Sequence, residues 1–241
     1  MNSPFSDPLV DKRKESLLDN TAASAFLRQV YTVMTLGMAI TGLAAWYIGG
    51  KLMGGEWLWL VQSPTIYILA FSPLILVWVL SARVERMSYQ TVNLMFASYA
   101  LLNGVALSPL LLIYTGASLA KTFFITAGTF GAMSIIGITT KQDLTKMGAY
   151  LQMAVIGLII AMVVNFFLKS PVVDYIVSAI GVVVFAGLTA YDTQKLLNFG
   201  AMSNLEDEPV RKMVVMGALT LYLDFLNLFL FLLRFFGGSR D

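Results

Sequence analysis

The sequence predicts an all-α membrane protein that crosses the bilayer seven times. Of its 241 residues, 58% are hydrophobic and only 12% are charged, and this is about half the charged fraction of an ordinary soluble domain. A transmembrane helix needs about 20 mostly apolar residues to cross the hydrocarbon core. Seven stretches of this kind follow one another along the chain, separated by short segments that carry charged residues, Gly or Pro.

These stretches divide the chain into three parts. Residues 1–28 are polar and evenly charged and are predicted to form a cytoplasmic N-terminal tail, residues 29–236 the transmembrane domain, and residues 237–241 a short C-terminal tail. The start of the chain lacks the basic flank, short apolar stretch and cleavage site of a signal peptide, so we expect the first span to stay in the mature protein. The predicted spans are 29–50, 58–82, 88–114, 119–139, 147–168, 172–197 and 212–236.

The distribution of basic residues predicts the orientation. With the N-terminus inside, eleven of the 16 Lys and Arg residues lie in the inner segments and five in the outer ones. Cytoplasmic segments carry the excess of Lys and Arg. We therefore expect a cytoplasmic N-terminus and, after seven spans, a C-terminus outside.

The absence of histidine and cysteine excludes several classes of site. Disulfides, thiolate nucleophiles, Ser-His pairs, haem ligation and ordinary zinc or copper sites each need one of these residue types. The net charge of +2 provides no strong basic field for nucleic acid. We expect a protein that is not an enzyme, binds no cofactor and no nucleic acid, and uses carboxylates, Lys or Tyr for any proton chemistry.

Among the carboxylates inside predicted spans, two are informative, because an unpaired charge there costs about 2.5–3.5 kcal/mol even on insertion scales. Asp224 lies near the centre of the last span, which favours a functional role. Asp192 lies toward the cytoplasmic end of the sixth span, where it is either a solvated acid at a helix end or a functional group. If the two approach, we expect them to share a proton near neutral pH, because like charges at short range resist double ionisation. Counting from the inner flanks separates their depths by roughly 15 Å, which helix tilt would have to close.

Other polar residues near these spans have two interpretations each. Arg83 and Arg86 lie at the inner end of the second span. They are either ordinary positive-inside anchors or a latch in which one of them pairs with Asp192. Arg86 is the first choice for this pairing. Asn227 follows Asp224 by three residues and so shares its helix face. Such an amide is either a hydrogen-bond partner between helices or an ion ligand. Prolines 64, 73 and 109 are expected to kink their spans.

The last two spans carry a family resemblance. Residues 187–194 (GLTAYDTQ) and 218–229 (ALTLYLDFLNLF), followed by 232–237 (LLRFFG), resemble the bacterial branch of the Bax inhibitor-1 family, also called the transmembrane Bax inhibitor motif family. The size, the seven spans and the polar N-terminal segment agree with this resemblance. Tyr191 and Tyr222, which lie in these strings, are counted with Asn227 as supporting polar residues.

The resemblance implies a seven-helix bundle whose last helix is central, and a calcium leak pathway in the bacterial inner (plasma) membrane. The paired aspartates of the family, regarded as its pH sensor, correspond to Asp192 and Asp224, which are also candidate calcium contacts. The gating arginine corresponds best to Arg86, with Arg83 as the alternative. In the implied mechanism, an Arg86–Asp192 bond and a hydrogen bond between the aspartates hold the pore closed, and proton occupancy shifts the closed and open populations.

Alternative functions use the same residues. A proton-coupled transporter would need the same buried acids, and a non-transporting membrane regulator that binds a quality-control protease would depend on the N-terminal tail instead. A retinal protein is excluded because residues 213–233 contain no Lys for a Schiff base, and the sequence lacks the Gly-x-Gly-Asp half of the intramembrane aspartyl protease signature. The expected partners are therefore the lipid bilayer, calcium and protons, with a membrane-bound protease under the last alternative.

Overall fold

The computed structural model describes residues 8–62 and 64–238, with side chains from residue 21 onward. All regular secondary structure in these residues is helical. The elements are α1 (Pro8–Met53), η1 (Leu58–Val61), α2 (Thr65–Arg83), η2 (Val84–Arg86), α3 (Tyr89–Leu107), α4 (Leu110–Ile113), α5 (Gly116–Thr139), α6 (Thr145–Leu168), α7 (Pro171–Ala201) and α8 (Glu208–Phe236).

Seven helical segments of the described residues are long and apolar enough to cross a membrane, and each overlaps one predicted span. The prediction of an all-α, seven-span integral membrane protein is confirmed. The segments are Thr21–Met53, Thr65–Arg86, Tyr89–Ile113, Gly116–Thr139, Thr145–Leu168, Pro171–Ala201 and Glu208–Phe236.

Prolines account for the differences between predicted and observed boundaries. The second span begins at Thr65 and not at residue 58, because Pro64 is the N-cap of α2 and residues 58–61 form the separate turn η1. The third predicted span is divided into α3 and α4 by Ser108 and Pro109. Proline has no N–H to donate to the preceding turn, so a helix tends to start at or after it.

The predicted tails are only partly covered by the structure. Residues 8–28 of the predicted N-terminal tail belong to α1, which runs from Pro8 without a break into the first span. Residues 1–7 of that tail and residues 239–241 of the predicted C-terminal tail lie outside the described residues.

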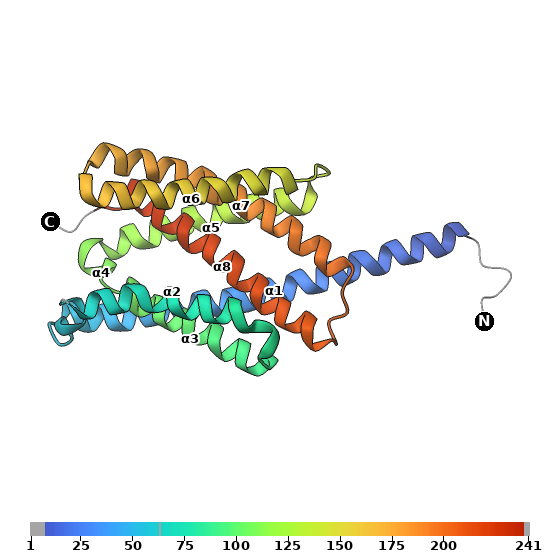
Figure 1. Cartoon of the computed structure of the whole chain (residues 1–241), viewed down its shortest axis with the longest axis horizontal. Helices are drawn as coiled ribbons and strands as arrows, with labels where there is room; N and C mark the ends of the chain where they lie inside the picture. Colours follow the sequence, from blue (N-terminus) through green and yellow to red (C-terminus); the bar gives the residue numbers. More distant parts are fainter. Residues whose placement is uncertain (1–7, 63, 239–241) are drawn as a thin grey trace.

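Helix α8 is the centre of the bundle, as the family resemblance implied. Of its most apolar window, 67% is buried, against 11% for α2 and α6. Helix α8 packs against α1, α3, α5 and α7. Figure 1 shows it crossing obliquely between a layer that contains α1, α2 and α3 and a layer that contains α5, α6 and α7. Most lipid-facing surface therefore belongs to the outer helices.

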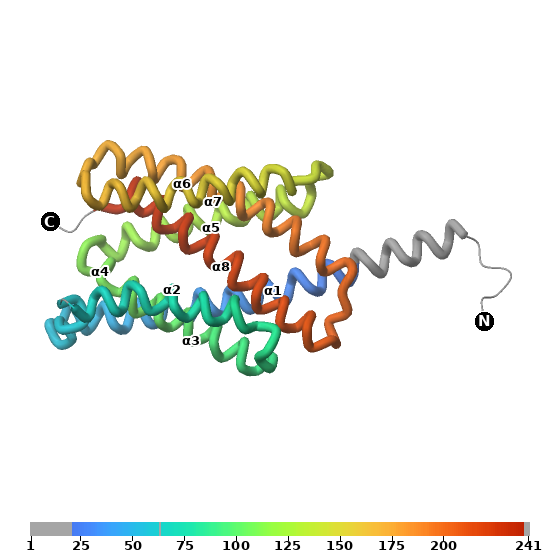
Figure 2. The backbone as a smooth tube through the Cα atoms, in the orientation of Figure 1, coloured from blue at the N-terminus to red at the C-terminus, as the bar shows by residue number. Residues whose placement is uncertain are grey.

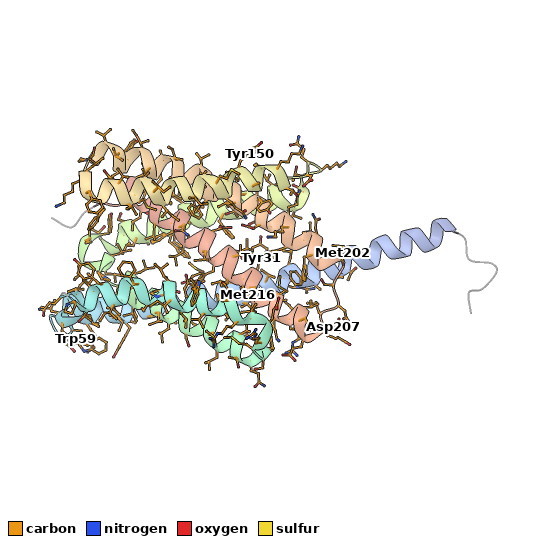
Figure 3. The ribbon with its side chains drawn as sticks, in the orientation of Figure 1. Tyr31, Trp59, Tyr150, Met202, Asp207 and Met216 are labelled. Carbon is orange, nitrogen blue, oxygen red and sulfur yellow. The ribbon has the colours of Figure 1, made fainter. Side chains whose placement is uncertain are left out.

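The seven spans alternate in direction, so the bundle has two distinct ends. Trp59, in the connection between α1 and α2, lies at one end, whereas Met202 and Asp207, in the connection between α7 and α8, lie at the opposite end (Figure 3). The tube in Figure 2 shows that α8 finishes at the end where α1 turns into α2. The end with Met202 is the predicted cytoplasmic end.

Close approach of α1 and α3 depends on a glycine. A Cβ atom at Gly104 would lie 2.6 Å from the carbonyl oxygen of Thr41 and 2.6 Å from the Cβ of Ala44. The first of these atoms belongs to the backbone and cannot rotate away. The two helices can therefore keep their present separation only with glycine at this position.

We predict that Gly104→Ala destabilises the bundle by about 1–3 kcal/mol, the range for overpacking a tight interior. The measurement is thermal or denaturant unfolding of the purified protein in detergent. Gly128→Ala is the matched control, because a Cβ at Gly128 would meet nothing within 4 Å, and there the better helix propensity of alanine is expected to leave stability equal or slightly higher. Equal stability of the Gly104→Ala variant and the wild type would contradict the packing argument.

Candidate functional site

The centre of the bundle contains the two predicted aspartates in direct contact. Asp192 of α7 is 7% exposed and Asp224 of α8 is 4% exposed. Their carboxyl groups lie close enough to share a hydrogen bond when one of them carries a proton. The structure thus brings together two acids that are 32 positions apart in the chain.

The oblique course of α8 explains how the two acids meet. Asp192 lies nine residues before the end of α7, and Asp224 lies 16 residues after the start of α8. In two straight antiparallel helices this difference would separate their depths by roughly 10 Å. Because α8 crosses the bundle at an angle (Figure 1), it advances less along the bundle axis per residue than a straight helix would. Helix tilt therefore closes the gap that the sequence indicated.

Asp224 is the more isolated member of the pair. Its Oδ2 atom is buried and has no hydrogen-bond partner among the described residues. A buried ionised carboxylate without compensation is costly in an apolar medium. The pair is therefore compatible with its surroundings only if a proton, water or a cation compensates its charge.

Neighbouring helices hold the part of α7 that carries Asp192. On α7 itself, the charge of Lys195 acts on Asp192, and the Lys195 Nζ lies 5.9 Å from the centre of the Tyr191 ring. The hydroxyl of the next residue, Thr193, lies 3.1 Å from the hydroxyl of Tyr31 of α1, and Tyr31 lies near the middle of the bundle in Figure 3. On the α5 side, Gly137 packs directly against the carbonyl of Ala190. Helices α1, α5 and α8 thus fix the position of this part of α7.

Comparison with known proteins now assigns the chain to a protein family. Residues 23–241 match the protein family described as "Inhibitor of apoptosis-promoting Bax1". The chain belongs to the Bax inhibitor-1 family. It is 44% identical over 240 residues to "Inner membrane protein YbhL" of Escherichia coli K12, covering 98% of each chain. It is also 44% identical over 216 residues to an uncharacterised protein of Rickettsia prowazekii, RP147, covering 90% of each chain, and 35% identical over 237 residues to the uncharacterised protein YrjE of Lactococcus lactis, covering 97% of each chain.

The predicted gating arginines of this Bax inhibitor-1 family member are not in contact with the aspartates. Arg83 ends α2, Arg86 ends η2, and both side chains are exposed. Within the described part of the chain neither arginine forms an ion pair. The cation whose charge acts on Asp192 is Lys195. The arginine latch therefore stays a prediction, beside the interpretation of the two arginines as membrane anchors.

The three supporting polar residues, Asn227, Tyr191 and Tyr222, contact groups other than the two aspartates. The Asn227 amide donates to the Leu223 carbonyl of its own helix, 2.8 Å away, and the Tyr191 ring packs on Gly148 of α6. Tyr222 is fully buried, and its hydroxyl lies 2.7 Å from Thr41 Oγ1. The same Thr41 oxygen lies 2.9 Å from the Ala100 carbonyl. Tyr222 thus links α8 to α1 and α3, on a different helix face from Asp224.

Sequence reasoning missed a set of hydroxyl groups on α5. Ser118, Thr122, Thr126 and Ser134 are all buried, although α5 contains no ionisable residue except Lys121. The signal that could have found them is their spacing, because three successive members are four residues apart and so lie on one helix face.

The Tyr222–Thr41 contact is expected to couple α8 energetically to α1. In a double-mutant cycle with Tyr222→Phe and Thr41→Val, we predict a coupling free energy of about 0.5–1.5 kcal/mol, the net contribution of one buried hydrogen bond. The measurement is unfolding of the single and double variants in detergent. Pairing Tyr222→Phe with Tyr150→Phe is the control, because Tyr150 is exposed on α6 and the two changes should be additive. Additive losses in the Tyr222 and Thr41 cycle would contradict the link.

Proposed function

We propose that this protein is a pH-sensitive cation leak pathway with calcium as the ion, in which Asp192 and Asp224 form the proton sensor. The observation that carries the proposal is the contact between these two carboxyl groups in the centre of the bundle. Intramembrane acids are expensive and usually mark an ion or proton path. Membership of the Bax inhibitor-1 family supports the proposal, because the resemblance implies this role for the same two positions.

Proton occupancy would control the packing of α7 against α8. With one shared proton, a hydrogen bond joins the two carboxyl groups and stabilises the observed crossing. Without it, two like charges repel by about 4 kcal/mol at a separation of 4 Å and an effective dielectric constant of 20. The helices then separate, or a cation binds between the carboxylates. Either response shifts the balance between closed and open populations.

The ligands available suit a calcium ion in transit. Calcium takes six to eight oxygen ligands, and the pair can supply carboxylate oxygens while water supplies the rest. Within the described residues no group of three or more Asp, Glu, His or Cys side chains could hold a metal ion. Conduction requires binding that is weak enough to release the ion. A two-carboxylate site that retains ligand water meets this requirement better than a complete protein cage.

We predict that calcium influx into liposomes depends on pH in the wild type and loses this dependence in Asp224→Asn. Between pH 6 and 8 the wild-type flux should change by up to about tenfold per pH unit, the limit for one controlling proton. The amide of Asn keeps the shape of the carboxyl group but cannot ionise, so the flux of the variant should be flat. Asp192→Asn should behave in the same way.

Asp143→Asn is the matched control for this experiment. Asp143 lies in the connection between α5 and α6, where hydrogen bonds from Thr145 hold the pKa of its carboxyl below the usual value, so it stays ionised throughout the range tested. Its variant should keep the wild-type pH profile. Absence of flux at every pH from folded wild-type protein would contradict the leak and favour the proton-coupled transporter or the protease-binding regulator.

We also propose that the protein lies in the inner membrane with its N-terminus in the cytoplasm and its C-terminus outside. The name of the relative YbhL describes that protein as an inner membrane protein, and the excess of Lys and Arg in the predicted inner segments sets the orientation. Alkaline phosphatase fused to the C-terminus in Escherichia coli should be active, because the enzyme needs the oxidising periplasm. The same enzyme fused after Asp143, in a predicted inner connection, should be inactive. The reverse pattern would overturn the orientation.

A further inference from the structure

Helix α5 has one buried face that is polar along much of its length. Ser118, Thr122, Thr126 and Ser134 are each at least nine-tenths buried, and Thr122 and Thr126 have no exposed surface. Residues four positions apart lie on successive turns of the same side of a helix. The hydroxyl groups therefore form a row, interrupted by Phe130, that we call the α5 hydroxyl row.

The packing of α5 shows where this row leads. Helix α5 packs against α7 and α8, so its buried face borders these two helices. At one end, the Ser118 hydroxyl donates to the carbonyl of Phe236 at the C-terminus of α8 (3.0 Å). At the other end, Gly137 packs on Ala190, two residues before Asp192. The row thus extends from the predicted outer end of the bundle toward the level of Asp192.

The middle of the row lies at the depth of Asp224. The ring of Phe225, the residue after Asp224, has its centre 5.6 Å from that of Phe123 and 5.4 Å from that of Phe130. Thr126 lies between these two positions of α5 in the sequence. Thr122 is therefore on the outer side of Asp224, and Ser134 lies between the level of Asp224 and that of Gly137, which packs on Ala190.

Two hydroxyls of the row lack hydrogen-bond partners. Thr126, Thr129 and Thr139 of the same helix each donate to the carbonyl four residues earlier. Thr122 Oγ1 and Ser134 Oγ are buried without any partner, and in the described part of the chain the only other buried side-chain oxygen in this condition is Asp224 Oδ2. Buried polar groups in folded proteins are satisfied by protein groups, water or ions. All three oxygens belong to the helices α5 and α8, so one hydrated path would satisfy them together.

We propose that the α5 hydroxyl row lines the route by which hydrated cations reach the Asp192–Asp224 pair from the outer side. This inference rests on the proposed function and names the side chains of its path. The hydroxyl oxygens would replace part of the hydration shell of the ion, and the carboxyl pair would supply the negative charge. Thr122 is the group on the outer approach, and Ser134 is the member of the row nearest to the level of Asp192.

An apolar cavity of about 450 Å³ offers the alternative route, between α1, α4, α5 and α8. On α5 it is lined by Leu119, Ala120 and Phe123 and not by the hydroxyl row. Trp46 and Phe124, which also line it, are 70% and 72% exposed, so it opens on the surface that faces lipid. An ion pays a large desolvation cost against such walls, and the hydroxyl row is therefore the favoured path.

Single cysteines test the path directly, because the natural chain contains no cysteine. Thr122→Cys, Ser134→Cys and Phe124→Cys are reconstituted in liposomes and exposed to silver ion, a small monovalent cation that replaces the thiol proton, forms an Ag–S bond and releases H⁺. Thiol left unreacted is titrated after denaturation. Cysteine at 122 and 134 should react about a hundredfold faster than at the lipid-facing position 124, the factor that corresponds to the cost of an ion in hydrocarbon. Asp143→Cys, in an exposed connection, is the control for silver access.

Calcium flux measured on the same samples separates this inference from the proposed function. Silver reaction at 122 and 134 without calcium flux would support the path and reject calcium as the ion. Calcium flux with an unreactive cysteine at 122, while Asp143→Cys reacts, would overturn the path.

A second variant removes the hydroxyl while keeping the shape of the side chain. Thr122→Val should lower calcium flux by about tenfold, the effect of one lost hydrogen bond at the barrier. Thr139→Val is the matched control, because Thr139 lies on the same helix but is exposed and bonded to the Ile135 carbonyl. Equal flux from Thr122→Val and Thr139→Val would also overturn the path.

Discussion

The bundle is organised by the need to keep two carboxyl groups away from lipid. An ionisable group inside hydrocarbon is tolerated only where other helices enclose it and something compensates its charge. Helix α8, which carries Asp224, is accordingly the most buried helix of the described chain. Helices α1, α3, α5 and α7 pack around it and shield it from the bilayer, and the exposed, largely apolar helices α2 and α6 pack outside them on α3 and α7. Asp192 needs the same protection, and α1, α5 and α8 provide it. The central position of the last helix is thus a consequence of the residue that it carries.

The central helix also connects the aspartate pair to the rest of the bundle. Asp224 faces α7, whereas Tyr222, two residues earlier, faces α1 and α3 through Thr41. Helix backbones are stiff. A change in the separation of the two carboxyl groups is therefore expected to move α8 relative to α7 and to strain the contact between Tyr222 and Thr41. Close packing at Gly104 holds α1 and α3 together, so these two helices respond as one unit. Under the proposed function, this connection is the element through which proton occupancy would act on the rest of the bundle.

The sequence was sufficient for the parts of the structure that depend on composition and local chemistry. Seven spans, the helical class and the burial of Asp224 all follow from apolar stretches and from the cost of an acid within them. The contact of Asp192 with Asp224 was harder, since counting residues separated their depths, and only the tilt of α8 removes that difference. The contacts of Tyr222 were not predictable from its place near Asp224, because a side chain two positions away on a helix faces another neighbour. Arg86 ends the turn η2 with an exposed side chain. The α5 hydroxyls were missed because neutral residues give no charge signal, although their four-residue spacing is visible in the sequence.

In the proposed pathway, the division between charged and neutral oxygens explains why one pair of acids would be sufficient for control by protons. The chain has no histidine, so protonation near neutral pH must involve carboxyl groups that titrate as a pair. Charge along the whole path would bind a divalent cation too tightly for it to leave. Hydroxyl groups replace water around an ion without adding charge. They therefore lower the cost of desolvating the ion and do not bind it too tightly to be released. In the proposed pathway, a single charged position beside a neutral row would let one proton control passage, at the place where α7 and α8 cross.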